Sequence, residues 1–191
     1  MPNQATNRFY YFTSAAIMKF FMHLAVAASL IATALCAPVT VPQVTAALAT
    51  INTDVSALIT VTVSFDGSAA QAANIENDAI KLIQANNAAL AAIKATATPF
   101  SLADGTTIFN IVKGGEPNIE KALSSIVAQK AAIQRLGLTA AVHQTLINLS
   151  TSTEALIVAL VGAAPAQLKS DATALGQKVT AAFSAAIAVY A

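Results

Sequence analysis

The side chains that most often carry out chemistry in proteins are scarce in this chain of 191 residues. It has two histidines and one cysteine, and after residue 36 only His143 remains of these. A catalytic triad needs a histidine held between an acid and a nucleophile, and no G-x-S-x-G elbow is present. A metal site needs clustered ligands, which one histidine and dispersed carboxylates do not form. The sequence therefore predicts no enzyme, no metal site and no cofactor.

Three features that resemble functional sites have simpler explanations. Glu116 and Glu120 lie one turn apart, where stabilisation of a helix N-terminus accounts for them without catalysis. His143 is expected to be a partly exposed surface residue. Asn148 begins the sequon Asn-Leu-Ser within a predicted helix, which makes it a candidate for N-glycosylation in a secreted chain.

Composition excludes several classes of protein. The chain is 56% hydrophobic and 10% charged with a net charge of +1, the reverse of a disordered sequence. Its ten Lys and Arg residues are scattered, so a nucleic-acid partner is not expected. A single cysteine excludes a disulfide framework.

Residues 18–37 read as a secretory signal peptide. Lys19 is followed by an apolar run and then by small residues, with Ala34 and Cys36 at the two positions that a signal peptidase recognises. We therefore expect residues 1–36 to be a signal region, with Met18 as a better start than Met1, and residues 37–191 to form a single secreted, extracellular domain. No later apolar run reaches the ~18 residues of a membrane span, so none is expected in that domain.

The elements that would hold any site are predicted to be helices. Apolar residues recur at spacings of four and three along five or six stretches, and Gly or Pro separates the stretches. Ser101 and Asp104 have the form of a capping box, and Thr139 is expected to cap a later helix. A short helix over 102–112 should end at Gly114-Gly115, and the next should start at Pro117 and stop at Gly137. The fold class is therefore all-α, an antiparallel bundle of about five to six amphipathic helices without disulfides.

A ligand site in such a bundle would be a dry slot walled by a few bulky residues. Many of the other core positions are small, because 37 alanines lie after residue 36. The short helix over 102–112 is expected to be the element that shifts to admit a ligand. The alternative is that the bulky residues simply form the core. The predicted wall residues are Leu90, Ile93, Phe100, Ile108, Phe109, Val112 and Phe183.

Several segments resemble the fungal hydrophobic surface-binding protein A family, whose domain is shared by cell-wall galactomannoproteins. They are the signal ending at Ala37-Pro38, the stretch Val55 to Gly67, Ser101 to Asp104, Ile126 to Lys130 leading to Gly137-Leu138, and Phe183 to Tyr190. The resemblance implies a secreted helical bundle that adsorbs to apolar surfaces or holds fatty acids between its helices. Wall-anchored relatives carry a Ser/Thr-rich tail and a lipid-anchor signal that do not follow here, so the expected wall association is non-covalent. The family's lysine pair is Gln129-Lys130 in this chain.

Two other functions stay open at this point. One is a protein–protein module such as a helical-bundle enzyme inhibitor, and the other is a structural or antigenic wall protein without a specific ligand. Lipid extraction from the purified protein separates the leading hypothesis, a non-catalytic lipid binder, from both.

Overall fold

The computed structural model describes residues 39–191, so the predicted signal region lies outside the described residues and the domain boundary after residue 36 stays a prediction. The described residues contain six α-helices, one short 3-10 helix and no strand, which confirms the predicted all-α bundle. The elements are α2 (Val41–Val63), α3 (Ala69–Ala95), α4 (Leu102–Ala128), α5 (Lys130–Arg135), α6 (Thr139–Ala163), η1 (Ala166–Leu168) and α7 (Lys169–Tyr190).

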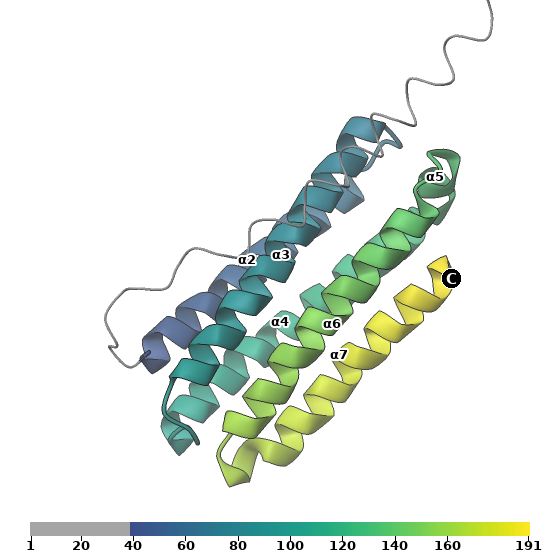
Figure 1. The fold of residues 1–191 in the computed structure, drawn as a ribbon. Helices are drawn as coiled ribbons and strands as arrows, with labels where there is room; N and C mark the ends of the chain where they lie inside the picture. The colour runs from purple at the N-terminus through teal and green to yellow at the C-terminus, as the bar shows by residue number, and fades with distance from the viewer. Residues whose placement is uncertain (1–38) are drawn as a thin grey trace, which may run out of the picture. The chain divides into compact units, whose positions relative to one another are not determined.

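The five long helices pack as a closed ring. Helix α2 packs against α3 and α4, α3 against α6, α6 against α7, and α7 against α4, which completes the ring (Figure 1). Successive long helices run in opposite directions along the chain. Each turns one apolar stripe inward, so the core occupies the centre of the ring, with Leu58 and Ile93 among its most completely buried side chains.

Local signals start α2 and α4, the second of them where the sequence predicts. The Thr40 N–H donates to Gln43 Oε1 at 2.8 Å at the start of α2. The Ser101 hydroxyl accepts from the Asp104 N–H at 3.1 Å, so Ser101 caps α4. The Asp104 carboxylate reaches back to the Ser101 hydroxyl, at 2.6 Å, rather than to its backbone N–H.

The prediction of two helices on either side of Gly114-Gly115 is wrong. Helix α4 is continuous from Leu102 to Ala128, with Pro117 inside it. An interior proline lacks the N–H that would bond four residues back and costs about 3 kcal/mol. Here its ring is on the exposed side, while the apolar face keeps its helical phase across the glycines. The short, movable helix expected over 102–112 therefore does not exist.

The expected helix from Pro117 to Gly137 is instead broken at Gln129. The Gln129 carboxamide donates to the Thr62 carbonyl at the end of α2, at 3.4 Å, and the chain turns there into α5. This turn lets α5 fold over one end of the ring, where Ile133 is buried. Helix α6 then starts at Thr139. The prediction that Thr139 caps this helix is wrong, because Leu138 is the N-cap and no side chain makes a capping bond. The preceding Gly137, at φ +70°, sets the turn.

Three helices are long and apolar enough to cross a membrane by length and composition alone: Val41–Val63, Thr139–Ala163 and Ala166–Tyr190. The sequence analysis expects no membrane span because no uninterrupted apolar run is long enough. The mean hydropathy of these three helices does not support that expectation. Much of that hydropathy comes from alanine on both faces, and Thr and Ser side chains on the outer faces hydrogen-bond to carbonyls within their own helix. The absence of a membrane span stays a prediction.

Candidate functional site

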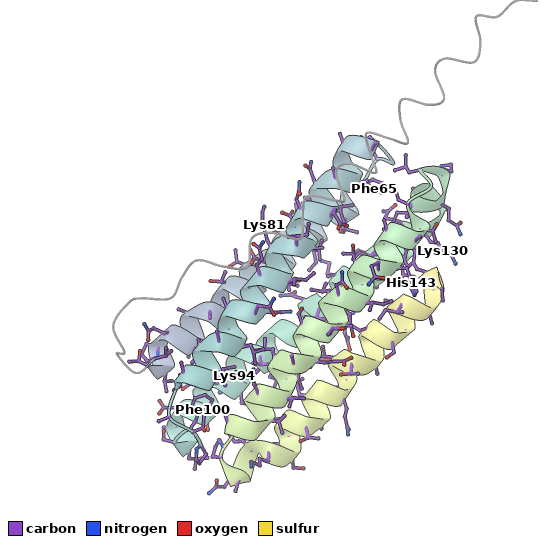
Figure 2. All side chains as sticks on the ribbon, viewed as in Figure 1. Phe65, Lys81, Lys94, Phe100, Lys130 and His143 are labelled. Atoms are coloured by element: carbon purple, nitrogen blue, oxygen red, sulfur yellow. The ribbon has the colours of Figure 1, made fainter. Side chains whose placement is uncertain are left out.

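The interior of the ring contains three hollows in a row. The middle hollow is lined by all five long helices and encloses about 770 Å³ between its walls, its open side included, of which about 70 Å³ admits the centre of a water-sized sphere. The basal hollow, about 530 Å³ with its open side included, lies beside Phe100 and η1. The distal hollow, about 430 Å³ with its open side included, lies under α5 and is lined by Glu76 and Ile133. Phe100 and Phe65 mark opposite ends of the helices in Figure 2.

Neighbouring hollows have wall residues in common. The basal and middle hollows share four wall residues, Val112, Ile157, Leu160 and Val179. The middle and distal hollows share Leu58, Ile126 and Leu149. The three hollows therefore follow one another through the interior of the ring, and we call this row the slot.

Close helix contacts at glycines hold the walls of this slot together. A Cβ at Gly176 of α7 would lie 2.5 Å from Ile157 Cγ2 of α6, and one at Gly105 of α4 would lie 2.6 Å from Pro165 Cδ. Gly115 of α4 is similarly pressed against the Asn52 carboxamide of α2. Because no other residue fits these approaches without a shift, the glycines set how near the helices lie around the hollows.

The walls are almost entirely apolar and uncharged. Lys, Arg and His are absent from the described residues that line the three hollows, and Glu76 is the single ionisable lining residue. The middle hollow has three polar wall residues, Asn52, Asn86 and Thr153. Asn86 is only 2% exposed and donates to Ser152 Oγ at 3.1 Å and Thr153 Oγ1 at 3.0 Å, which joins α3 to α6 inside the ring.

Glu76 lies in the wall of the distal hollow and is half-buried. The Thr145 hydroxyl of α6 lies 2.9 Å from Glu76 Oε2 and 3.1 Å from Oε1, so it donates to this carboxylate. Burial raises the pKa of Glu76, and the Thr145 hydrogen bond opposes that rise. A carboxylate therefore sits at the border between the apolar slot and water.

The structure brings five of the seven predicted wall residues to the hollows. Phe100, Ile108, Phe109 and Val112 line the basal hollow, and Val112 and Phe183 line the middle one. Leu90 and Ile93 line none of the three; they pack in the core, as the alternative reading held. Whether the five bind a ligand stays a prediction.

Sequence reasoning missed the wall residues of α6 and, apart from Phe183, those of α7. Ile157 and Leu160 lie on the broad apolar face of α6, and Leu175 and Gly176 on that of α7. The signal was available in α6, where Leu156, Ile157, Leu160 and Val161 form a stripe wider than one partner helix can cover.

The remaining candidates lie away from the hollows. His143 is half-buried on α6, as expected. Asn148 is exposed on the same helix and its Oδ1 accepts from Gln144 Nε2 at 3.0 Å, and its glycosylation stays a prediction. Within residues 39–191, no three His, Cys, Asp or Glu side chains lie close enough to hold a metal ion.

The ring and its uncharged interior define an all-α bundle with an internal apolar slot. The sequence profile of the family described as hydrophobic surface binding protein A matches residues 41–162. The chain belongs to this family, as the resemblance predicted. No curated protein sequence matches it significantly.

Solved structures share the fold. AFMP4P in complex with palmitic acid is 33% identical, with a TM-score of 0.77 over 80% of this chain and 100% of that one. Ligand binding domain 1 of the Penicillium marneffei MP1 protein, complexed with arachidonic acids, is 19% identical with a TM-score of 0.74, over 81% of this chain and 99% of that one. Domain 2 of the same protein, complexed with multiple arachidonic acids, is 17% identical with a TM-score of 0.62, over 79% of this chain and 91% of that one. The two MP1 domains show the fold alone.

Proposed function

We propose that this protein is a non-catalytic lipid binder that encloses a long alkyl chain, such as that of a fatty acid, in the row of hollows. The observation that carries the proposal is the row itself: three apolar spaces with shared wall residues, in the centre of a closed ring. Each buried CH₂ group contributes about 0.8 kcal/mol to binding, which favours a long chain. The palmitic acid of AFMP4P, a relative of the same fold, supports this class of ligand.

The walls suggest how a fatty acid would lie. Its carboxylate gains nothing from the slot, whose lining has no cation, and would be repelled by Glu76 at the distal end. The carboxylate would therefore stay at the basal end near Phe100, with the alkyl chain passing Val112 and Val179 into the middle hollow.

A cavity-filling variant tests the proposal. Ala122 is 4% exposed and lines the middle hollow, so Ala122→Leu should fill space that the alkyl chain needs. Displacing about two methylene groups should weaken palmitic acid binding about 10-fold. The fold should keep or gain stability because the added carbons occupy a void.

The matched control is Ala128→Leu, at an exposed position of the same helix, which should bind as the unmodified protein does. Displacement of a fluorescent fatty acid, alongside thermal melts, measures both quantities. Equal binding by both variants would refute a ligand in the middle hollow. Absence of any co-purifying lipid together with absence of fatty-acid binding would favour the protein-partner or structural wall hypotheses instead.

We also propose that the chain is secreted, on the strength of residues 18–37 alone. N-terminal sequencing of protein recovered from culture medium should begin at or within a residue or two of Ala37. Recovery of the apolar run Phe20 to Leu35 in the extracellular protein would contradict this. Non-covalent association with a cell wall would follow secretion, and release of the protein by salt or mild detergent tests it.

A further inference from the structure

The distal hollow differs from the other two in having a carboxylate in its wall. Glu76 is held by one neutral donor, Thr145. Among residues 39–191 the one ion pair joins Lys81 to Asp78, at 2.8 Å, and leaves Glu76 out. The rest of the wall consists of aliphatic residues and Thr62, whose hydroxyl is already donated to the Leu58 carbonyl at 2.6 Å.

This wall offers acceptors to a ligand but few donors. Each carboxylate oxygen of Glu76 accepts more than one hydrogen bond, and Thr145 uses only one direction of approach. Hydrogen bonds to an ionised group are roughly twice as strong as those between neutral groups. A head group that donates hydrogen bonds would therefore be stabilised here, whereas the carboxylate of a fatty acid would meet a like charge.

The position of the carboxylate suits a head group rather than a chain. Glu76 is half-buried, so part of its side chain is in contact with water, and a polar head bound to it can keep part of its own water. Leu58, Ile126 and Leu149 separate the distal from the middle hollow, and an alkyl chain that passes them enters the largest apolar space of the ring.

We propose that the distal hollow is the head-group subsite for an amphiphile whose head donates hydrogen bonds, a long-chain amine above all, with Glu76 as the residue that selects it. The amine lies at the Glu76 carboxylate and its alkyl chain extends into the middle hollow. This inference rests on the proposed lipid binding. It places the head group of the amine at the distal end of the slot, whereas the carboxylate of a fatty acid would lie at the basal end.

Three probes with the same alkyl chain test the head group: dodecylamine, dodecanol and dodecanoate, each below its micelle-forming concentration and titrated against the full chain by displacement of a fluorescent lipid. We expect dodecylamine to bind at least about 10-fold more tightly than dodecanoate, as a charge-assisted bond to Glu76 requires. Dodecanol, a neutral donor, should lie between them. Dodecanol and dodecylamine binding equally would show that a hydrogen-bond donor suffices and would overturn the preference for the amine.

Two variants on the same helix locate the effect. Glu76→Gln keeps an acceptor for Thr145, removes the charge, and should lower dodecylamine affinity about 10-fold while leaving or raising that of dodecanoate. Asp78→Asn removes the same charge two residues away, outside the hollow, and should change dodecylamine affinity less than about 2-fold. Circular dichroism confirms that both fold.

The outcomes separate this inference from the function on which it rests. Binding of dodecanoate with equal or weaker binding of dodecylamine, or loss of amine affinity in both variants alike, would overturn the Glu76 subsite and leave the lipid-binding function intact. Binding of none of the three probes would overturn both.

Discussion

Two adjacent glycines inside α4 should respond differently to the same substitution. Gly114 is exposed, and a Cβ there meets nothing within 4 Å, whereas a Cβ at Gly115 would collide with the Asn52 carboxamide of α2. Replacing glycine by alanine inside a helix stabilises it by about 0.5–1 kcal/mol, mainly by restricting the unfolded chain. Gly114→Ala should gain this amount in full, raising the melting temperature by about 1–4 °C for a chain of this size.

Gly115→Ala has the same helical gain but must displace Asn52. The carboxamide is the far end of a flexible, half-buried side chain that can rotate away, so the displacement should cost only about 1 kcal/mol and cancel the helical gain. Urea titration of the two variants measures both values. In an Asn52→Ala background the obstruction is gone, and Gly115→Ala should become stabilising, with a coupling of about 1 kcal/mol or more between the two sites.

The reasoning is refuted by one simple result. If Gly115→Ala stabilises the protein as much as Gly114→Ala does, then α4 does not approach α2 closely at this point. The account of why α4 continues through its two glycines would then be wrong as well.

Three further predictions address the core and the hollows. Burial raises the pKa of Tyr190 to about 12, and its hydroxyl donates to the Ile126 carbonyl at 2.6 Å. Tyr190→Phe should therefore lower the free energy of unfolding by about 1–2 kcal/mol in urea titrations, and an unchanged midpoint would contradict the hydrogen bond. Burial raises the pKa of Glu76, so the folded chain holds this proton to higher pH than the unfolded chain does. The contribution of Glu76 to stability should be fully present below its unfolded pKa and be lost as pH rises through its folded pKa, and Glu76→Gln should remove this contribution in melts across the acidic range. Phe183→Ala, at a residue 3% exposed, should cost about 3–5 kcal/mol, whereas Phe109→Ala, at a half-buried wall of the basal hollow, should cost about half as much and still weaken palmitic acid binding.

The helices and their inward faces could be predicted from the sequence because both depend on local information. The spacing of Val44, Leu48, Ile51, Val55 and Leu58 defines one face of α2, and all five are buried. Ser101 ahead of Asp104 starts α4 by a capping bond that spans three residues. Such signals need no knowledge of what lies across the bundle.

The features that were predicted wrongly depend on residues far away in the chain. Gly115 reads as a helix end in the sequence, yet it permits the approach of Asn52, more than sixty residues earlier. The break at Gln129 is associated with its bond to the Thr62 carbonyl, also more than sixty residues distant. Such residues can either end a helix or lie within a continuous one, and contacts with the neighbouring helix determine which of the two occurs.

The candidate site could be predicted only in part for a similar reason. An apolar stripe shows which residues face inward but not whether they face a void or another side chain. Ile93 and Phe183 are equally well buried, yet only Phe183 borders a hollow. The place of Glu76 beside Thr145 depends on the register between α3 and α6, which no short motif encodes.

The row of hollows also determines how the ligand-free protein should respond to compression. Unfolding lets water enter space that the folded ring leaves empty, so the system loses volume as the chain opens. Hydrostatic pressure should therefore unfold this bundle more readily than a helical protein of the same length with a filled core. A bound alkyl chain would remove much of that volume difference, so pressure resistance becomes a measure of occupancy that requires no label on the ligand.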